Sequence, residues 1–205
     1  MKKSLFAIVA ALMFAVNVKA QKYGPWDMFV GPRAGVVLNN FTSVDGDMET
    51  GLLLGVNAEV FFTSNISLNM GVSFTHQGCN DVQYGNIAPD ETPRYYDYDL
   101  DYINTEFTVR YYPVSRFSVF TGIDFGRVVN PKIHGERGNR DISDYLHKGT
   151  VAFPVGMAVN YKNVELNVAY RYQVNKIGRG SFNNFIGDAR NQSLMISMMY
   201  KIQLF

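Results

Sequence analysis

Between residues 66 and 75 the chain reads Ile-Ser-Leu-Asn-Met-Gly-Val-Ser-Phe-Thr, so apolar residues alternate strictly with small or polar ones. Side chains two positions apart share one face of a β-strand, and this period is therefore typical of a strand. One face of it carries only Ile, Leu, Met, Val and Phe, and the other carries Ser, Asn, Gly and Thr. The sequence thus predicts a strand that lies between an apolar and a polar environment.

The same two-residue period recurs along the chain. It appears in eight runs, of which the first is the least regular: 29–38, 51–62, 66–77, 102–112, 117–128, 150–161, 164–175 and 192–205. Short turns at 63–65, 113–116 and 162–163 alternate with long links at about 39–50, 78–98, 131–149 and 177–191. This asymmetry and an even strand number are typical of bacterial outer-membrane barrels. We therefore expect an all-β fold, an eight-stranded antiparallel up-and-down transmembrane β-barrel.

The first 20 residues are typical of a secretory signal peptide. Lys2 and Lys3 precede an apolar run at 5–16, and Val18-Lys19-Ala20 offers a small-residue cleavage site. No later segment approaches the roughly 18 consecutive apolar residues that a membrane helix needs. We expect residues 1–20 to be cleaved, and residues 21–205 to form a single barrel domain in the outer membrane of a Gram-negative envelope.

The placement of charge indicates which face of the strands points to lipid. The apolar faces carry almost no charge, whereas a soluble barrel around an apolar ligand, the alternative, would need a hydrated exterior. The polar faces carry small residues and balanced charges, and buried charges are tolerated only when they are paired. We therefore predict a polar, side-chain-filled interior plugged by a salt-bridge network of Arg33, Glu59, Glu106, Arg110, Asp124, Glu165, Arg171 and Lys201.

Aromatic residues near the strand ends could form the girdles that mark membrane interfaces. They are Tyr111, Tyr112, Phe117, Tyr161, Tyr170, Tyr172 and Tyr200.

Three stretches of sequence carry a family resemblance. They are Asp101–Pro113 (DYINTEFTVRYYP), Tyr170-Arg171-Tyr172 with Asn175, and Asn191–Ser197 leading to Tyr200-Lys201. In these stretches, and over essentially the whole mature chain, the protein resembles the PorT-like small outer-membrane β-barrels of Bacteroidota. The resemblance implies an outer-membrane location and no particular activity, and it allows a narrow porin-like conduit or an accessory of a secretion machine.

The chain departs from the family pattern in two places. Residues 105–108, Thr-Glu-Phe-Thr, are less aliphatic than the corresponding strand usually is. The last residue, Phe205, is of the type that often ends outer-membrane proteins, but it falls on the polar face of the alternation. A bulge or a shifted register would be needed to aim it at lipid.

Asp97, Asp99 and Asp101 alternate within the Tyr-rich stretch 95–102. Carboxylates on one side of a strand could bind a hard cation such as Ca²⁺, and such an ion would bridge to lipopolysaccharide. An EF-hand loop starting at Asp97 would need Gly at 102 and Glu at 108, where the chain has Tyr102 and Thr108. An acidic, exposed strand end is the simpler interpretation, and a cation site is the alternative.

The histidines offer little for catalysis. Outer-membrane lipid hydrolases activate a serine through an imidazole, but Ser73 and His76 lie on opposite faces of their strand. His134 and His147 lie with Ser143 in the third long link, so such a pair would have to form across strands.

Two further features have ordinary interpretations. Arg137, Arg140 and Lys148 form a basic cluster that could contact lipid phosphates, although a hydrated loop explains it equally. The single cysteine, Cys79, excludes an internal disulfide and a cysteine-based metal cluster. We expect neither a cofactor nor a structural metal.

These observations predict a non-enzymatic barrel with a structural role or a role in contacts made through its long loops. The expected partners are outer-membrane lipids and lipopolysaccharide, the barrel assembly machinery and an envelope protein partner. The net charge of +1 gives no reason to expect nucleic acid. The alternatives are the conduit, the secretion accessory, the lipid hydrolase and the soluble lipid-binding barrel.

Overall fold

The strands are long, and their order along the chain is simple. The computed structural model describes residues 23–42, 46–83, 95–135, 138–142, 146–178 and 189–204. Within these residues the strands are β1 (Met28–Phe41), β2 (Asp47–Phe61), β3 (Ile66–Gln83), β4 (Tyr95–Val114), β5 (Phe117–Gly135), β6 (Gly138–Asp141), β7 (Gly149–Tyr161), β8 (Val164–Gln173), β9 (Asn191–Tyr200) and β10 (Ile202–Gln203). None of the described residues belongs to a helix that is long and apolar enough to span a membrane.

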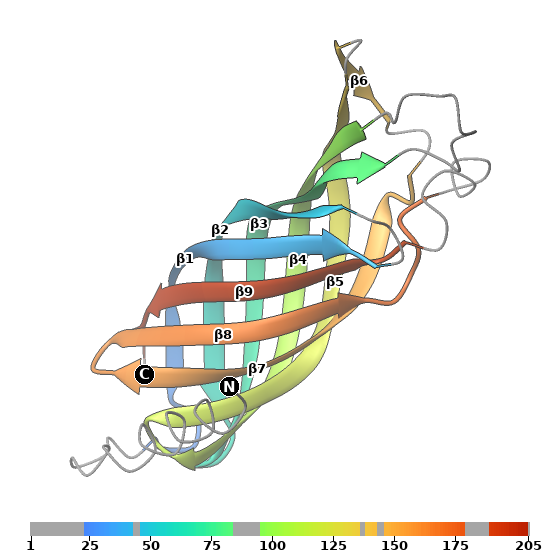
Figure 1. Ribbon diagram of the computed structural model, residues 1–205. Helices are drawn as coiled ribbons and strands as arrows, with labels where there is room; N and C mark the ends of the chain where they lie inside the picture. The colour runs from blue at the N-terminus through green and yellow to red at the C-terminus, as the bar shows by residue number, and fades with distance from the viewer. Residues whose placement is uncertain are drawn as a thin grey trace, which may run out of the picture.

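Eight of these strands close into an antiparallel barrel (Figure 1). Each of β1, β2, β3, β4, β5, β7, β8 and β9 pairs with the next, and β9 pairs back onto β1 from Arg33↔Met199 to Phe41↔Asn191. The two-residue β10 continues this seam beside β1, and β6 forms a hairpin with the end of β5. The predicted fold class is confirmed. Residues 1–20 and Phe205 lie outside the described residues, so the signal peptide and the placement of Phe205 stay predictions.

The two ends of the barrel differ. The turns at 62–65, 115–116 and 162–163 lie at one end, which we call the turn end, and the longer connections lie at the other, the loop end. At the loop end the strands run further than the sequence predicts: β4 begins at Tyr95 and β5 continues to Gly135, towards β6 at the top of Figure 1. The predicted link at 131–149 was wrong in this respect, because backbone pairing continues where the apolar alternation has stopped.

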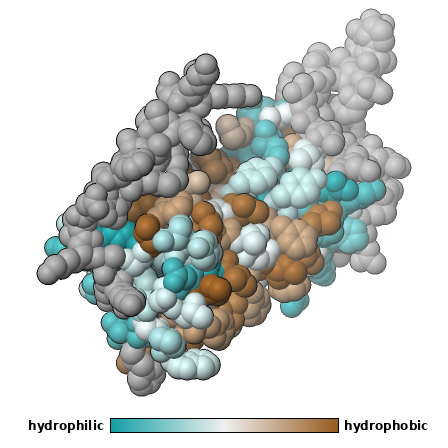
Figure 2. Space-filling model, turned by 90° about the horizontal axis from the view of Figure 1, so that it is seen from below, coloured by the Kyte–Doolittle hydropathy of each residue, from teal (hydrophilic) through white to brown (hydrophobic). Residues whose placement is uncertain are grey.

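The barrel wall has an apolar outside. Each of the eight strands exposes apolar side chains on its outer face, and we call this surface the apolar belt; examples are Val36, Leu54, Val72, Phe107, Val119, Val155, Leu166 and Ile196. In Figure 2 brown, hydrophobic atoms occupy the middle of the visible wall, with teal patches towards its ends. Leu54 and Val56 are 48% and 56% exposed, whereas Asn57 and Glu59 on the opposite face are 2% and 0% exposed.

The inside is layered rather than uniformly polar. At the turn end Tyr23, Phe29, Phe61 and Tyr112 form an aromatic cluster, in which Tyr23 and Phe61 stack with ring centroids 4.1 Å apart. The middle holds a smaller apolar cluster that includes Leu53 and Phe120. At the loop end a third cluster fills the mouth; its members are Phe41, Cys79, Val82, Tyr98, Leu100, Tyr102, Val128, Ile142, Leu146, Ile177 and Ala189. Tyr112 is therefore an interior residue and not part of an interfacial girdle.

Candidate functional site

Next to the aromatic cluster at the turn end, on the side towards the middle of the barrel, the interior holds a network of four charged side chains. Lys201 Nζ lies 2.5 Å from Glu59 Oε2 and 2.7 Å from Glu165 Oε2. Arg110 Nη1 lies 2.5 Å from the other oxygen of Glu165, so this carboxylate bridges two cations. Tyr112 donates its hydroxyl hydrogen to Glu59 Oε1 at 2.6 Å. Each charge is thus paired and hydrogen-bonded, which is the condition for burying it.

Two further ion pairs lie in the middle of the bore. Arg171 Nε donates to Asp124 Oδ2 at 2.5 Å, and its two Nη atoms donate to Gln77 and Asn104 at 3.0 and 3.2 Å. Arg33 Nη1 lies 3.4 Å from Glu106 Oε1, and Arg33 Nε donates to Ser197. The side chains of Arg110 and Arg171 are 1% exposed and are among the largest fully buried ones.

All eight charged residues named from the sequence lie inside the barrel, four cations against four anions. They come from β1, β2, β4, β5, β8 and Lys201, so the network ties opposite walls together. The sequence did not point to the neutral partners around them, such as Gln77, Asn104 and Asn167. An amide on a polar strand face looks the same in sequence whether it faces water or an arginine. Between its aromatic layer and its apolar mouth, the described part of this bore holds buried, paired charges and buried amides.

A second polar group lies on the outer wall at the loop end, beyond the apolar belt. We call it the rim cluster: Glu49 on β2, His76 on β3, Asp99 and Asp101 on β4, and His134 on β5. His76 Nε2 lies 2.8 Å from Glu49 Oε1, and His76 Nδ1 lies 2.7 Å from Asp101 Oδ1. His134 Nε2 lies 2.7 Å from Asp99 Oδ2.

Burial and neighbouring charges act in opposite directions on the pKa values of Glu49 and of His76. Burial raises the pKa of the Glu49 carboxyl above its ordinary value, and the nearby His76 only partly opposes this. For His76, burial disfavours the imidazolium, but the hydrogen bond to Asp101 and the charges of Glu49, Asp101 and Asp99 outweigh it and raise its pKa. The imidazole therefore sits in a strongly anionic setting.

The predicted cation site of Asp97, Asp99 and Asp101 is not formed as one group. The three carboxylates share the outer face of β4, yet each has a different partner: Asp97 accepts from the Asp81 backbone N–H at 2.9 Å, Asp99 pairs with His134, and Asp101 with His76. Of the three, Asp99 lies in a set with Glu49 and His76 whose donor atoms are within 4.8 Å of one another. The sequence missed Glu49 because β2 is irregular there, with a register shift between Met48 and Leu53.

Among the residues that the structure describes, the remaining candidates from the sequence do not form a serine–histidine pair. Both ring nitrogens of His76 face carboxylates, and Ser73 lies on the opposite face of β3. Ser143 and Arg137 lie outside the described residues, as does the side chain of Arg140. Cys79 is fully buried, and burial raises the pKa of its thiol, in agreement with its interpretation as a packing residue.

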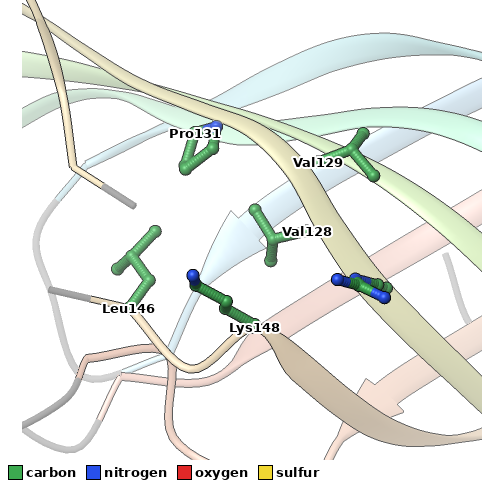
Figure 3. A pocket seen from close by; sticks show the side chains of 6 residues that line it. Val128, Val129, Pro131, Leu146 and Lys148 are labelled. Atoms are coloured by element: carbon green, nitrogen blue, oxygen red, sulfur yellow. The ribbon is translucent and has the colours of Figure 1, made fainter. Parts of the chain in front are cut away.

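Lys148 lines a pocket at the loop end (Figure 3). Its cavity volume is about 210 Å³, and its other lining residues are Arg127, Val128, Val129, Pro131 and Leu146. Figure 3 shows the Lys148 side chain lying beside Leu146 and Val128. Pockets for small-molecule ligands usually measure about 300–1,000 Å³, so this one is small for such a role.

Comparisons with known proteins bear on the fold. No protein family and no curated protein matches the sequence. Among solved structures, the chain is similar to Ail, the attachment invasion locus protein of Yersinia pestis, with a TM-score of 0.53 and 13% identity over 87% of this chain and 99% of Ail. The outer membrane protein OprG of Pseudomonas aeruginosa (TM-score 0.49, 12% identity, 90% and 99% covered) and Neisserial surface protein A (0.48, 14%, 85% and 97%) also match.

The likeness to Ail covers nearly the whole of both chains, whereas the identity is low. It shows a shared fold, and the PorT-like resemblance stays a prediction because no family matches. On the architecture the comparison and the strand pairing agree: this chain forms a small, closed, eight-stranded β-barrel of the kind that Ail forms.

Proposed function

We propose that this chain is an integral protein of the bacterial outer membrane, with a sealed barrel and a structural or loop-mediated interaction role. One observation carries the proposal: the wall is apolar outside and charged inside. Soluble monomers rarely expose contiguous apolar patches above a few hundred Å². Here all eight strands contribute exposed apolar side chains, and in the part of the chain that the structure describes each of them pairs with a neighbour on both sides. Both properties suit a hydrocarbon environment.

The height of the belt supports the same placement. On β3 the outer face is apolar from Ile66 to Phe74, and the first outward polar side chain beyond it is His76. This span of nine residues agrees with the roughly 9–11 residues of a tilted transmembrane strand. The belt is the opposite of what a soluble barrel around an apolar ligand requires.

The filled bore supports a sealed barrel over a conduit. Paired charges occupy its middle, and clusters of packed side chains occupy both ends. What remains for contact with partners is the loop end, where β4, β5 and β6 extend beyond the belt (Figure 1). We propose that lipids and lipopolysaccharide surround the belt, that the barrel assembly machinery inserts the chain, and that an envelope partner binds at the loop end. This role needs no enzymatic activity.

Fractionation and heat modification test the membrane placement. The protein should sediment with outer membranes, and an unboiled sample should migrate faster on a gel than a boiled one, because a barrel stays compact in detergent. Recovery as an unshifted soluble periplasmic protein would overturn the proposal.

Conductance tests the seal separately. In a planar lipid bilayer the folded barrel should give no unitary currents. Reproducible single-channel steps would replace the sealed barrel with the narrow conduit and would leave the membrane placement intact.

A further inference from the structure

Three side chains of the rim cluster point their donor atoms at one place on the outer wall. They are Glu49, His76 and Asp99, from three neighbouring strands, and the donor atoms all lie within 4.8 Å of one another. Two carboxylates and one imidazole form a mixed oxygen and nitrogen donor set. The pairing of β3 with β4 fixes two of the three, since His76 lies opposite Asp101 and Gly78 lies opposite Asp99.

A second shell orients the imidazole. Asp101 Oδ1 lies 2.7 Å from His76 Nδ1, which leaves Nε2 directed at Glu49 Oε1, 2.8 Å away. Asn130 Nδ2 in turn donates to the other Asp101 oxygen at 3.0 Å. Metal-ligating histidines usually donate their second ring N–H to a carboxylate in this way, which fixes the tautomer that offers the free nitrogen.

Glu49 has one buried carboxylate oxygen that accepts no hydrogen bond from the described residues. Its side chain is 9% exposed, and this oxygen is Oε2. A buried carboxylate oxygen without a partner is costly. The absence of a side chain at Gly78 admits this oxygen: a Cβ placed there would come within 1.8 Å of Glu49 Oε2 and of the Tyr98 carbonyl oxygen.

We propose that Glu49, His76 and Asp99 bind a first-row transition-metal dication such as Zn²⁺, with Asp101 as the positioning residue for His76. An imidazole ligand favours such an ion over Ca²⁺ or Mg²⁺, which prefer all-oxygen sites. Zn²⁺ would draw the donors together, since tetrahedral ligands at about 2.1 Å from the metal lie roughly 3.4 Å apart. His76 is 33% exposed, so water completes the coordination from the outside.

The bound ion would cross-link β2, β3 and β4, because each strand contributes one ligand. Both pairings are irregular near the site, with register shifts between Met48 and Leu53 and between Cys79 and Val82. A ligand that binds only the folded state stabilises it by mass action. The site therefore joins strands beyond the apolar belt, where register shifts interrupt their pairing. This inference does not depend on the membrane placement.

Zinc titration of the mature chain tests the proposal. The protein, without a histidine tag, is refolded in detergent, and its folding is checked by heat modification. Zn²⁺ is then titrated in competition with a chromophoric chelator. One ion should bind per chain, excess Ca²⁺ should not displace it, and His76→Gln and Asp99→Asn should each weaken binding at least tenfold. His147→Gln removes an exposed histidine outside the cluster and should leave the affinity unchanged.

The positioning role of Asp101 has its own readout. Asp101→Asn should weaken binding about 10–100-fold, as second-shell changes typically do. In the NMR spectrum of the Co²⁺-bound protein, the hyperfine-shifted imidazole proton signals of a histidine ligand should persist in this variant and be lost in His76→Gln. No zinc binding by the folded wild type, or equal affinity of wild type and His76→Gln, would overturn the metal site while leaving the proposed membrane role untouched.

Discussion

Arg171 shows how much a single interior residue contributes to the stability of the barrel. The guanidinium holds Asp124 and also donates to Gln77 and Asn104, so Arg171→Ala removes three partners at once. Breaking a buried pair typically costs about 3–5 kcal/mol, because the other charge is left unpaired. We expect Arg171→Ala to lower the free energy of unfolding in urea by that amount. Arg127→Ala, which removes an exposed arginine, should change it little.

A double-mutant cycle makes this prediction specific. Replacing both charges, as Arg171→Met with Asp124→Leu, removes the buried charges together and should cost clearly less than the sum of the single changes. Additive costs would mean that the two side chains do not act as a pair.

Cys79 provides a second residue-level prediction. The thiol is fully buried in the cluster at the loop end, and burial raises its pKa, so little reactive thiolate is accessible. A maleimide reagent should leave the folded barrel unlabelled and label it fully in denaturant. Val129 is exposed, so a Cys79→Ser, Val129→Cys variant should label at once in the folded state. Rapid labelling of Cys79 in the folded wild type would mean that the cluster opens.

At the scale of residues, the sequence identified what charge and alternation encode. The apolar faces carry almost no charge and must face lipid, so the charged residues on the polar faces had to point into the barrel. In a narrow eight-stranded barrel such charges are tolerated only when they are paired. Glu49 and Tyr112 were beyond this reasoning. Glu49 lies within the register shift between Met48 and Leu53, which breaks the link between sequence phase and strand face. Tyr112 is amphipathic, and its hydroxyl reaches Glu59 across the interior rather than a membrane surface.

Strand pairing in this barrel depends on close approaches that only glycine allows. A Cβ on Gly122 of β5 would lie 1.9 Å from the Phe107 carbonyl oxygen of β4, a backbone atom that cannot simply turn away. Gly149, at the start of β7, has open space instead. We expect Gly122→Ala to lower stability by about 1–3 kcal/mol through this crowding, and Gly149→Ala to have little effect. The midpoint temperature of heat modification measures both, and equal midpoints would contradict the assigned β4–β5 register.

Strand ends were the least predictable feature at the element scale. Apolar alternation located the cores of the eight strands, because the belt imposes a period of two. Beyond the belt, β3, β4 and β5 continue through stretches such as 97–101, where acidic side chains on the outer face replace the apolar ones. The two-residue period persists at 97–102, but its outer face is acidic, so the apolar pattern that marks a strand in the belt is missing. The rim cluster lies in this zone, so its assembly from four strands followed only from the structure.

The fold of the whole molecule could be predicted, whereas its partner could not. A closed barrel with an apolar outside follows from composition along each strand, since every segment repeats the same pattern. A partner contact depends on a few side chains at the loop end, and their arrangement has no repeating signal. The likeness to Ail extends over the fold at only 13% identity, so the surface chemistry of the two chains is largely independent.

The membrane placement makes the sharpest prediction for the molecule as a whole. Val56 lies in the belt and is 56% exposed; Val129 is 45% exposed and lies on the loop-end part of β5, beside Asn130, which pairs with Asp101 of the rim cluster. In lipid vesicles Val56→Arg should lower the free energy of unfolding by about 2–4 kcal/mol, because a charge near the bilayer midplane is poorly solvated, whereas Val129→Arg should cost about 1 kcal/mol or less. In a water-exposed wall both substitutions would be equally mild. Urea unfolding of the two variants in vesicles therefore distinguishes a barrel surrounded by lipid from one surrounded by water, and equal small effects would remove the main support for the membrane proposal.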